Sequence, residues 1–164
     1  MNNHPYSKNA KAPLKLFPAN RPGQSISIDR IGKIQGPGRY SWILTIVDRF
    51  TRFVQAVPLI NAESTTIAHA LMEHYFWKYG CAESLHSDRA GNLDQSTVMK
   101  ILYNLLSIYK TRTTSYHARG NGQCEVYNKH IVVMIKKLVA EHQKDWEHKL
   151  NIVCFALNLS LIHI

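Results

Sequence analysis

Two neighbouring stretches of this sequence decide its fold: SISIDRI at residues 25–31 and WILTIVDRFTRFVQAVP at residues 42–58. The first alternates apolar and polar residues, which predicts a strand with one buried face. The second contains two β-branched, apolar runs, residues 42–47 and 53–58, joined by a short polar connection. A Gly-Pro-Gly turn at residues 36–38 separates the two stretches. We therefore expect three antiparallel strands in a meander.

Helical and extended patterns alternate after these strands. Apolar residues at three- and four-residue spacing indicate helices, and short apolar runs indicate buried strands. The order predicts an α/β fold with one five-stranded mixed sheet, three antiparallel strands followed by two parallel ones, flanked by helices. The further predicted elements are helices over 61–79, 96–106 and 123–142, a last helix that opens at Trp146, and strands at 84–88 and 109–114.

The inner faces of two of these helices follow from their apolar spacing. The helix over 96–106 is expected to bury Val98, Ile101, Leu102 and Leu105. The long helix over 123–142 is expected to bury the stripe Tyr127, Ile131, Ile135, Leu138 and Val139.

The composition indicates a single globular domain with a basic surface. The 164 residues include 20 Lys and Arg against 11 Asp and Glu, a net charge of +9, and 45% are apolar. Residues 1–52 alone hold nine Lys or Arg and two Asp. Nucleic acid is the commonest partner of such a surface, and a basic protein without such a partner is the alternative.

The cysteines and the lack of long apolar segments indicate in which cellular compartment the protein is expected. Cys81, Cys124 and Cys154 are odd in number and form no C-x-x-C pair, which argues against a disulfide framework and a cysteine zinc site. We find no signal peptide and no apolar run that could cross a membrane. The nine histidines are not spaced as a zinc set. We expect a nuclear or cytoplasmic protein that is not secreted and does not contact membranes.

Three acidic residues occupy positions where a carboxylate could take part in catalysis or metal binding. Asp29 interrupts a strand, Asp88 follows the fourth strand, and Glu125 lies in the first turn of the long helix. If the first strand lies beside the fourth, Asp29 and Asp88 come together. Taken singly, each has an ordinary structural interpretation as an edge residue, a cap or a favourable helix start.

Together, three convergent carboxylates repel one another and stay ionised near neutral pH only with hard cations between them. Ligand sets made of oxygen alone select Mg²⁺ or Mn²⁺. Two such ions about 4 Å apart can clamp the attacking and leaving oxygens of a phosphodiester. The sequence therefore suggests an enzyme that cuts or joins nucleic-acid strands.

Four ordered motifs carry a family resemblance: SIDRIG around Asp29, WILTIVDRFTRF at residues 42–53, LHSDR at residues 85–89, and Tyr116-His117 followed by GNGQCE at residues 120–125 and Asn128. They resemble the integrase catalytic core of gypsy-type LTR retrotransposons, which retroviral integrases share. The resemblance covers residues 21–158. It leaves residues 1–20 as an extended basic N-terminal arm and residues 159–164 as an atypical or truncated tail.

The resemblance implies a ribonuclease-H-like fold with a catalytic and metal site at Asp29, Asp88 and Glu125 that holds two Mg²⁺ or Mn²⁺ ions. The implied reactions are processing of the 3′ ends of element DNA and their transfer into target DNA. The implied partners are both DNAs and further copies of the chain, as a homodimer or higher oligomer.

Four further positions are expected to bind DNA. Tyr116 and Asn121 match loop residues that contact DNA ends, and Lys129 matches a basic residue that touches phosphate near the metals. His117 lies in the same loop and is a candidate DNA contact. Packing of Tyr116 and solvation of Lys129 are the alternatives.

Several positions depart from the family pattern: Ala90 stands before Gly91, Ala118 replaces a common proline, and Val126 replaces a usual arginine. The flanking zinc-binding and C-terminal DNA-binding domains are not present in the sequence, which suggests a fragment, a decayed copy or a domesticated one. One alternative is therefore a catalytically inactive nucleic-acid-binding module of the same fold. A ribonuclease acting on RNA–DNA hybrids is another, against which the integrase-specific loop argues.

Overall fold

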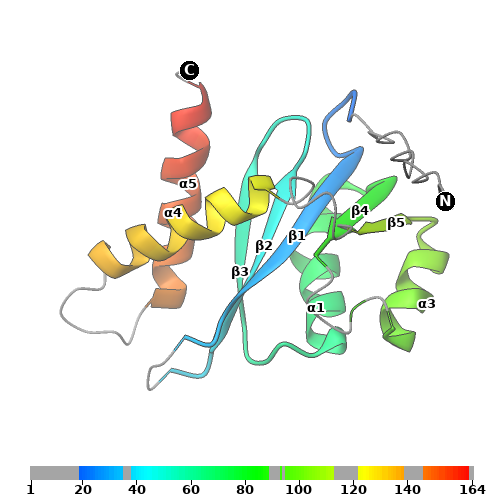
Figure 1. Cartoon of the computed structure of the whole chain (residues 1–164), viewed down its shortest axis with the longest axis horizontal. Coiled ribbons are helices and arrows are strands. Elements are labelled where there is room, and N and C mark those ends of the chain that lie inside the picture. The colour runs from blue at the N-terminus through cyan, green and yellow to red at the C-terminus, as the bar shows by residue number, and fades with distance from the viewer. Residues whose placement is uncertain are drawn as a thin grey trace, which may run out of the picture.

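The structure, a computed structural model, describes residues 19–34, 38–88, 93, 95–112, 122–138 and 146–162. Residues 1–18 of the predicted N-terminal arm lie outside these ranges. A sheet occupies the centre, with helices on both of its faces (Figure 1).

The sheet confirms the predicted topology. Strand β1 pairs antiparallel with β2, which pairs antiparallel with β3, while β4 lies parallel to β1 and β5 parallel to β4. The spatial order is β3-β2-β1-β4-β5. The strands are β1 (Ser25–Gly32), β2 (Trp42–Asp48), β3 (Val54–Leu59), β4 (Ser84–Ser87) and β5 (Tyr109–Arg112).

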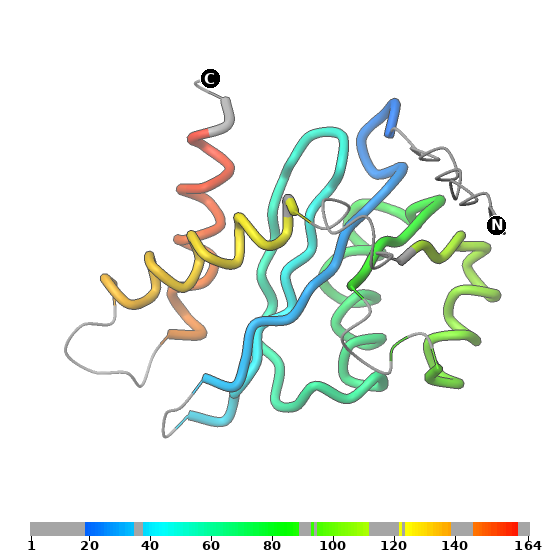
Figure 2. The backbone as a smooth tube through the Cα atoms, viewed as in Figure 1, coloured from blue at the N-terminus to red at the C-terminus, as the bar shows by residue number. Residues whose placement is uncertain are grey.

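The helices match the predicted positions, with one internal difference. The helix expected over 61–79 is a continuous helical run whose middle is a π-helix, and Gly80, with φ of 83°, follows its last turn. Figure 2 traces this run and the two later helices that cross the other face. The helical segments are α1 (Ser64–Leu71), η1 (Met72–Phe76), α2 (Trp77–Tyr79), α3 (Thr97–Leu105), α4 (Gly122–Leu138) and α5 (Trp146–Ile162).

Two apolar cores sandwich the sheet, because successive strand residues point to opposite faces. Ile26 and Ile28 of β1 pack with α1, η1 and α3 on one face. Ile43 and Val47 of β2 pack with α4 and α5 on the other. Asp29 follows Ile28 and is therefore directed to the α4 side.

The predicted inner face of α3 is wrong at three of four positions. Val98, Ile101 and Leu105 are exposed, whereas the buried residues are Met99, Leu102 and Tyr103. Apolar residues cover two sides of this helix, so spacing alone does not select the buried side. In α4, Leu138 is also exposed, whereas Tyr127, Ile131 and Ile135 are buried as predicted; Val139 lies outside the described residues.

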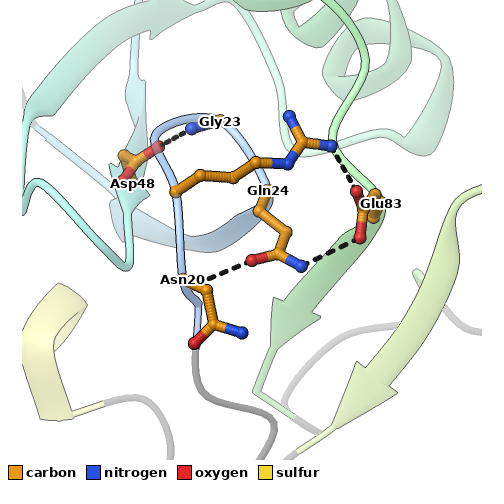
Figure 3. A network of polar contacts seen from close by, with 6 residues as sticks. Asn20, Gly23, Gln24, Asp48 and Glu83 are labelled. Atoms are coloured by element: carbon orange, nitrogen blue, oxygen red, sulfur yellow. Dashed lines mark hydrogen bonds and ion pairs between the residues drawn. The ribbon is translucent and has the colours of Figure 1, made fainter.

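A polar network joins the start of β1 to two other segments (Figure 3). The Asp48 carboxylate, only 4% exposed, accepts hydrogen bonds from the backbone N–H groups of Gly23, Phe50 and Thr51. Gln24 donates to Glu83, which also pairs with Arg21. Asp48 thus fixes both the β2–β3 turn and the residues that lead into β1, while Glu83 holds the same residues to the segment before β4. 

Helix α5 closes the outer edge of β3 through Asn158. The Asn158 amide donates to the Val54 carbonyl at 2.9 Å, and its oxygen accepts from the Val54 N–H at 2.8 Å. The side chain therefore makes the pair of bonds that a neighbouring strand would make. Helix α5 continues to Ile162, past the predicted boundary at residue 158, which stays a prediction.

Replacing Asn158 by alanine should lower the free energy of unfolding by about 1–2 kcal/mol, because it removes two hydrogen bonds to partly buried backbone groups. Urea unfolding followed by circular dichroism measures this change. Asn151→Ala, at an exposed position of the same helix, is the matched control and should leave the midpoint nearly unchanged. Equal midpoints for both variants would show that the two Asn158–Val54 hydrogen bonds contribute nothing to stability.

Candidate active site

Strand register brings Asp29 and Asp88 together. The last β1–β4 pair in the parallel ladder is Ile28 with Ser87, so Asp29 and Asp88 occupy the next position on neighbouring strands. Neighbouring strands lie about 4.8 Å apart, and residues in register point to the same face. The structure therefore supports the predicted meeting of these two aspartates on the α4 side of the sheet.

Helix α4 supplies the third carboxylate. Glu125 lies in its first turn, as predicted, and is exposed. One turn further along, the Asn128 side-chain nitrogen donates to Asp29 Oδ2 at 2.8 Å. This bond ties the beginning of α4 directly to the middle of β1, at the predicted site.

The electrostatic environment of Asp29 includes both other acids. Burial raises the pKa of the Asp29 carboxyl above its ordinary value, and the negative charges of Asp88 and Glu125 raise it further. A hydrogen bond from the Arg30 backbone N–H to Asp29 Oδ1, at 2.8 Å, and the charge of Arg30 act in the opposite direction. Three carboxylates from β1, the end of β4 and α4 thus share one electrostatic environment.

The donor chemistry of this group fits a hard divalent cation. All three side chains offer oxygen ligands, and a cation would relieve the repulsion that Asp29 experiences. Across the residues that the structure describes, however, no set of three or more His, Cys, Asp or Glu side chains is gathered closely enough to hold a metal. The predicted metal site therefore stays a prediction.

A buried histidine lies beside the carboxylates. His86 is on the same face of β4 as Asp88, and its Nδ1 lies 2.9 Å from Thr111 Oγ1. Burial lowers the pKa of His86 to about 4, with the positive charges of Arg49 and Lys110 acting in the same direction and Asp88 opposing them. The ring is therefore neutral at physiological pH and contributes a hydrogen-bonding group rather than a charge.

The predicted DNA-binding residues are only partly covered. Lys129 lies on α4, exposed, one turn after Glu125. Tyr116, His117 and Asn121 lie outside the described residues. Asn128 belongs to the quoted motif but receives no role from the sequence; its spacing of three from Glu125 on a helix is the signal that it faces the same region.

A cavity of about 310 Å³ lies elsewhere and contains none of the predicted site residues. Three of its seven lining residues are aromatic, with Phe53 in edge contact with Tyr79 and Tyr79 in contact with Tyr75. The candidate site at α4 does not coincide with this cavity. The lining residues are Pro22, Gly23, Asp48, Thr51, Phe53, Tyr75 and Tyr79.

Comparison with known proteins identifies relatives for most of the chain. The family model described as "Integrase core domain" matches residues 19–111. The Retrovirus-related Pol polyprotein from transposon 412 of Drosophila melanogaster is 23% identical over 141 residues, covering 84% of this chain and 11% of that protein. The Gag-Pol polyprotein of feline leukemia virus is 29% identical over 136 residues, covering 82% of this chain and 8% of that protein. The chain thus spans about a tenth of the length of these curated relatives.

The fold also has a solved counterpart. A cryo-EM structure of the simian T-cell lymphotropic virus intasome in complex with PP2A regulatory subunit B56 gamma contains a chain that matches with a TM-score of 0.71. The sequence identity is 18%, and the match covers 82% of this chain and 48% of that one. The two chains share a fold. Among the described residues, none of the helices has the length and apolar character needed to span a membrane.

Proposed function

This chain belongs to the integrase core domain family and has its ribonuclease-H-like fold, and from that membership we propose that it is a metal-dependent polynucleotidyl transferase that processes and joins retroelement DNA 3′ ends. DNA integration is the role of the family as a whole. The observation that carries the finer proposal is the pairing of Asp29 with Asp88 by strand register, within the electrostatic reach of Glu125.

In this proposal Asp29, Asp88 and Glu125 hold Mg²⁺ or Mn²⁺, with two ions expected. When bound, the ions supply positive charge that activates the attacking oxygen and stabilises the leaving one. The chain supplies rigid placement. Asp29 is held by two hydrogen bonds within β1 and from α4, and Glu125 is carried on a helix that packs on both β1 and β2.

We place the DNA along the exposed side of α4. Lys129 stands one turn from Glu125, where it can pair with a phosphate next to the carboxylates. Tyr116, His117 and Asn121, which precede α4 in the chain, are proposed to contact the DNA ends. The net charge of +9 favours association with this polyanion in nucleus or cytoplasm, and assembly of several copies would bring two DNA ends together.

A calorimetric titration with Mn²⁺ tests the site directly. Wild type should bind Mn²⁺, and Glu125→Gln should weaken the binding by about 100-fold, because it removes one of three anionic ligands. Glu147→Gln, which changes an acid on α5, is the control and should bind like wild type. Equal affinities for wild type and Glu125→Gln would remove Glu125 from the site.

Assays on the wild-type protein distinguish the proposed transferase from a non-catalytic DNA-binding module and from a ribonuclease. A non-catalytic DNA-binding module would bind DNA in a salt-sensitive manner and show no cleavage or joining when Mn²⁺ is added. A ribonuclease would prefer RNA–DNA hybrids over DNA duplexes with element-like ends. Strand-transfer assays on both substrates, at matched salt, separate these outcomes from the proposed one.

A further inference from the structure

The cavity of about 310 Å³ lies where three separate segments of the chain meet. Its walls come from the residues that lead into β1, from the connection between β2 and β3, and from the helical run that ends at Tyr79. Pockets for small ligands have volumes from about 300 Å³ upwards, so this one suits a small molecule or a single side chain of a partner. It contains none of the residues assigned to DNA or metal, so a ligand here would occupy a second site.

Three aromatic rings form a continuous part of the cavity wall. Tyr79 contacts Phe53, with ring centroids 5.8 Å apart, and Tyr75, with ring centroids 5.1 Å apart. The ring planes are inclined by 63° and 49°, so this wall is angled rather than flat. Tyr75 is buried, whereas Phe53 and Tyr79 are exposed, so a ligand can reach the rings from solvent. Aromatic faces carry partial negative charge and attract cations.

The same cavity holds a carboxylate. Asp48 is one of its lining residues and is buried, and it is held in place by backbone N–H groups, including that of Gly23 (Figure 3). Burial raises the pKa of the Tyr75 hydroxyl, and the negative charge of Asp48 raises it further, so the charge acts on the aromatic wall. The lining residues that the structure describes include no Lys or Arg, so no basic side chain on the wall offsets this charge.

The hydrogen bonds of the cavity distinguish between kinds of cation. Both Asp48 oxygens already accept from backbone N–H groups, and Thr51 Oγ1 accepts from the Phe53 N–H at 3.1 Å. A primary ammonium has three N–H donors that each need an acceptor, whereas a quaternary ammonium has none. A quaternary ammonium is bound through charge and contact with aromatic rings. We propose that this cavity binds a quaternary ammonium group, the chemistry shared by choline and a trimethylated lysine side chain.

Three probes of related shape test the proposal on the full chain. They are choline, ethanolamine, which has a primary ammonium, and the neutral alcohol in which carbon replaces the nitrogen of choline. Amide chemical shifts in NMR titrations should change at the lining residues, and choline should bind at least about tenfold more tightly than either other probe. Equal binding of the neutral alcohol would show an apolar cavity without preference for a cation and would overturn the proposal. So would choline titrations that leave the lining residues unshifted.

Variants test whether the aromatic wall makes the contact. Tyr79→Ala should weaken choline binding by about tenfold, because Tyr79 touches both other rings, and Tyr79→Phe, which keeps the ring, should bind like wild type. Trp77→Ala is the matched control: it removes an exposed ring of the same helical segment that is not among the described lining residues. Phe53→Leu gives a second ring deletion in case Tyr79→Ala does not fold. Wild-type affinity in the ring-deletion variants contradicts the proposal.

A peptide that contains trimethyl-lysine distinguishes the two sources of the group. It is compared with the same peptide carrying unmodified lysine and with free choline. Tighter binding of the methylated peptide than of choline identifies a polypeptide ligand, and the reverse identifies a small molecule. If neither binds, the proposal fails. None of these titrations contains metal or DNA, so their outcome is independent of the proposed transferase activity.

Discussion

Asp88→Asn should lower Mn²⁺-dependent strand transfer by about 1,000-fold or more. Asp88 directly follows β4 and occupies the position beside Asp29, so its loss leaves the site with two carboxylates of three. Metal-ion catalysis supplies several kcal/mol of charge stabilisation, and about 4 kcal/mol corresponds to roughly a 1,000-fold change in rate. The measurement is a strand-transfer or disintegration assay on DNA oligonucleotides with Mn²⁺.

The control for Asp88→Asn is Glu73→Gln, which removes one exposed negative charge on η1, on the opposite face of the sheet from α4. It should retain wild-type activity. Without metal, Asp88→Asn should be at least as stable as wild type, since the charge of Asp88 repels Asp29 in the folded protein. Full strand transfer by Asp88→Asn would exclude the carboxylate site as proposed.

Asp48→Ala should give the largest loss of stability, about 3 kcal/mol in the free energy of unfolding. The buried carboxylate accepts from three backbone N–H groups, those of Gly23, Phe50 and Thr51, and alanine leaves these donors without their acceptor. Hydrogen bonds to charged groups contribute about 1.5–3 kcal/mol each, and partial access of water to the turn reduces the sum. Urea unfolding at neutral pH measures the change.

Asp48→Asn refines this prediction. Its amide oxygen can still accept from Phe50 and Thr51, but its NH₂ group then faces the Gly23 N–H, donor against donor. The loss should therefore be intermediate. Glu83→Ala, which breaks an exposed pair with Arg21, should change the midpoint much less. A wild-type midpoint for Asp48→Ala would mean that the turn is held by other contacts.

The local sequence pattern was sufficient to predict a strand or helix and its apolar face where only one face of the element was apolar. Strand β1 alternates regularly, and Ile26 and Ile28 are both buried on one face as expected. The prediction of a single buried face is wrong, because Ser25 and Ser27 on the other face are buried too, under the helices that cover that side of the sheet. In α3 the pattern was ambiguous, because the helix has two apolar sides, one with Met99 and one with Ile101. Packing against α1 buries the side with Met99 and leaves Ile101 exposed. The π-helix of η1 has no comparable sequence signal, so a uniform α-helix was the natural expectation.

The site shows the same division between local and long-range information. The three acids stand out in the sequence because folding requires a carboxylate at none of their positions. Asp29 lies within a strand, Asp88 directly follows one, and Glu125 lies in the first turn of a helix. The bond from Asn128 to Asp29 depends on how α4 settles on β1, which no local spacing contains. Long-range contacts of this kind require the folded chain, whereas the acids themselves could be selected from sequence.

The two hydrogen bonds between Asn158 and the Val54 backbone affect how the protein behaves in concentrated solution. An outermost strand with unsatisfied peptide groups recruits strands from other molecules, which leads to fibrous aggregates. Here a side-chain amide occupies that docking position at Val54 of β3, and it is carried by a helix that packs against the same strand. A chain cut short before residue 158 would expose this strand and become prone to precipitation, even though every strand of the sheet would still be intact.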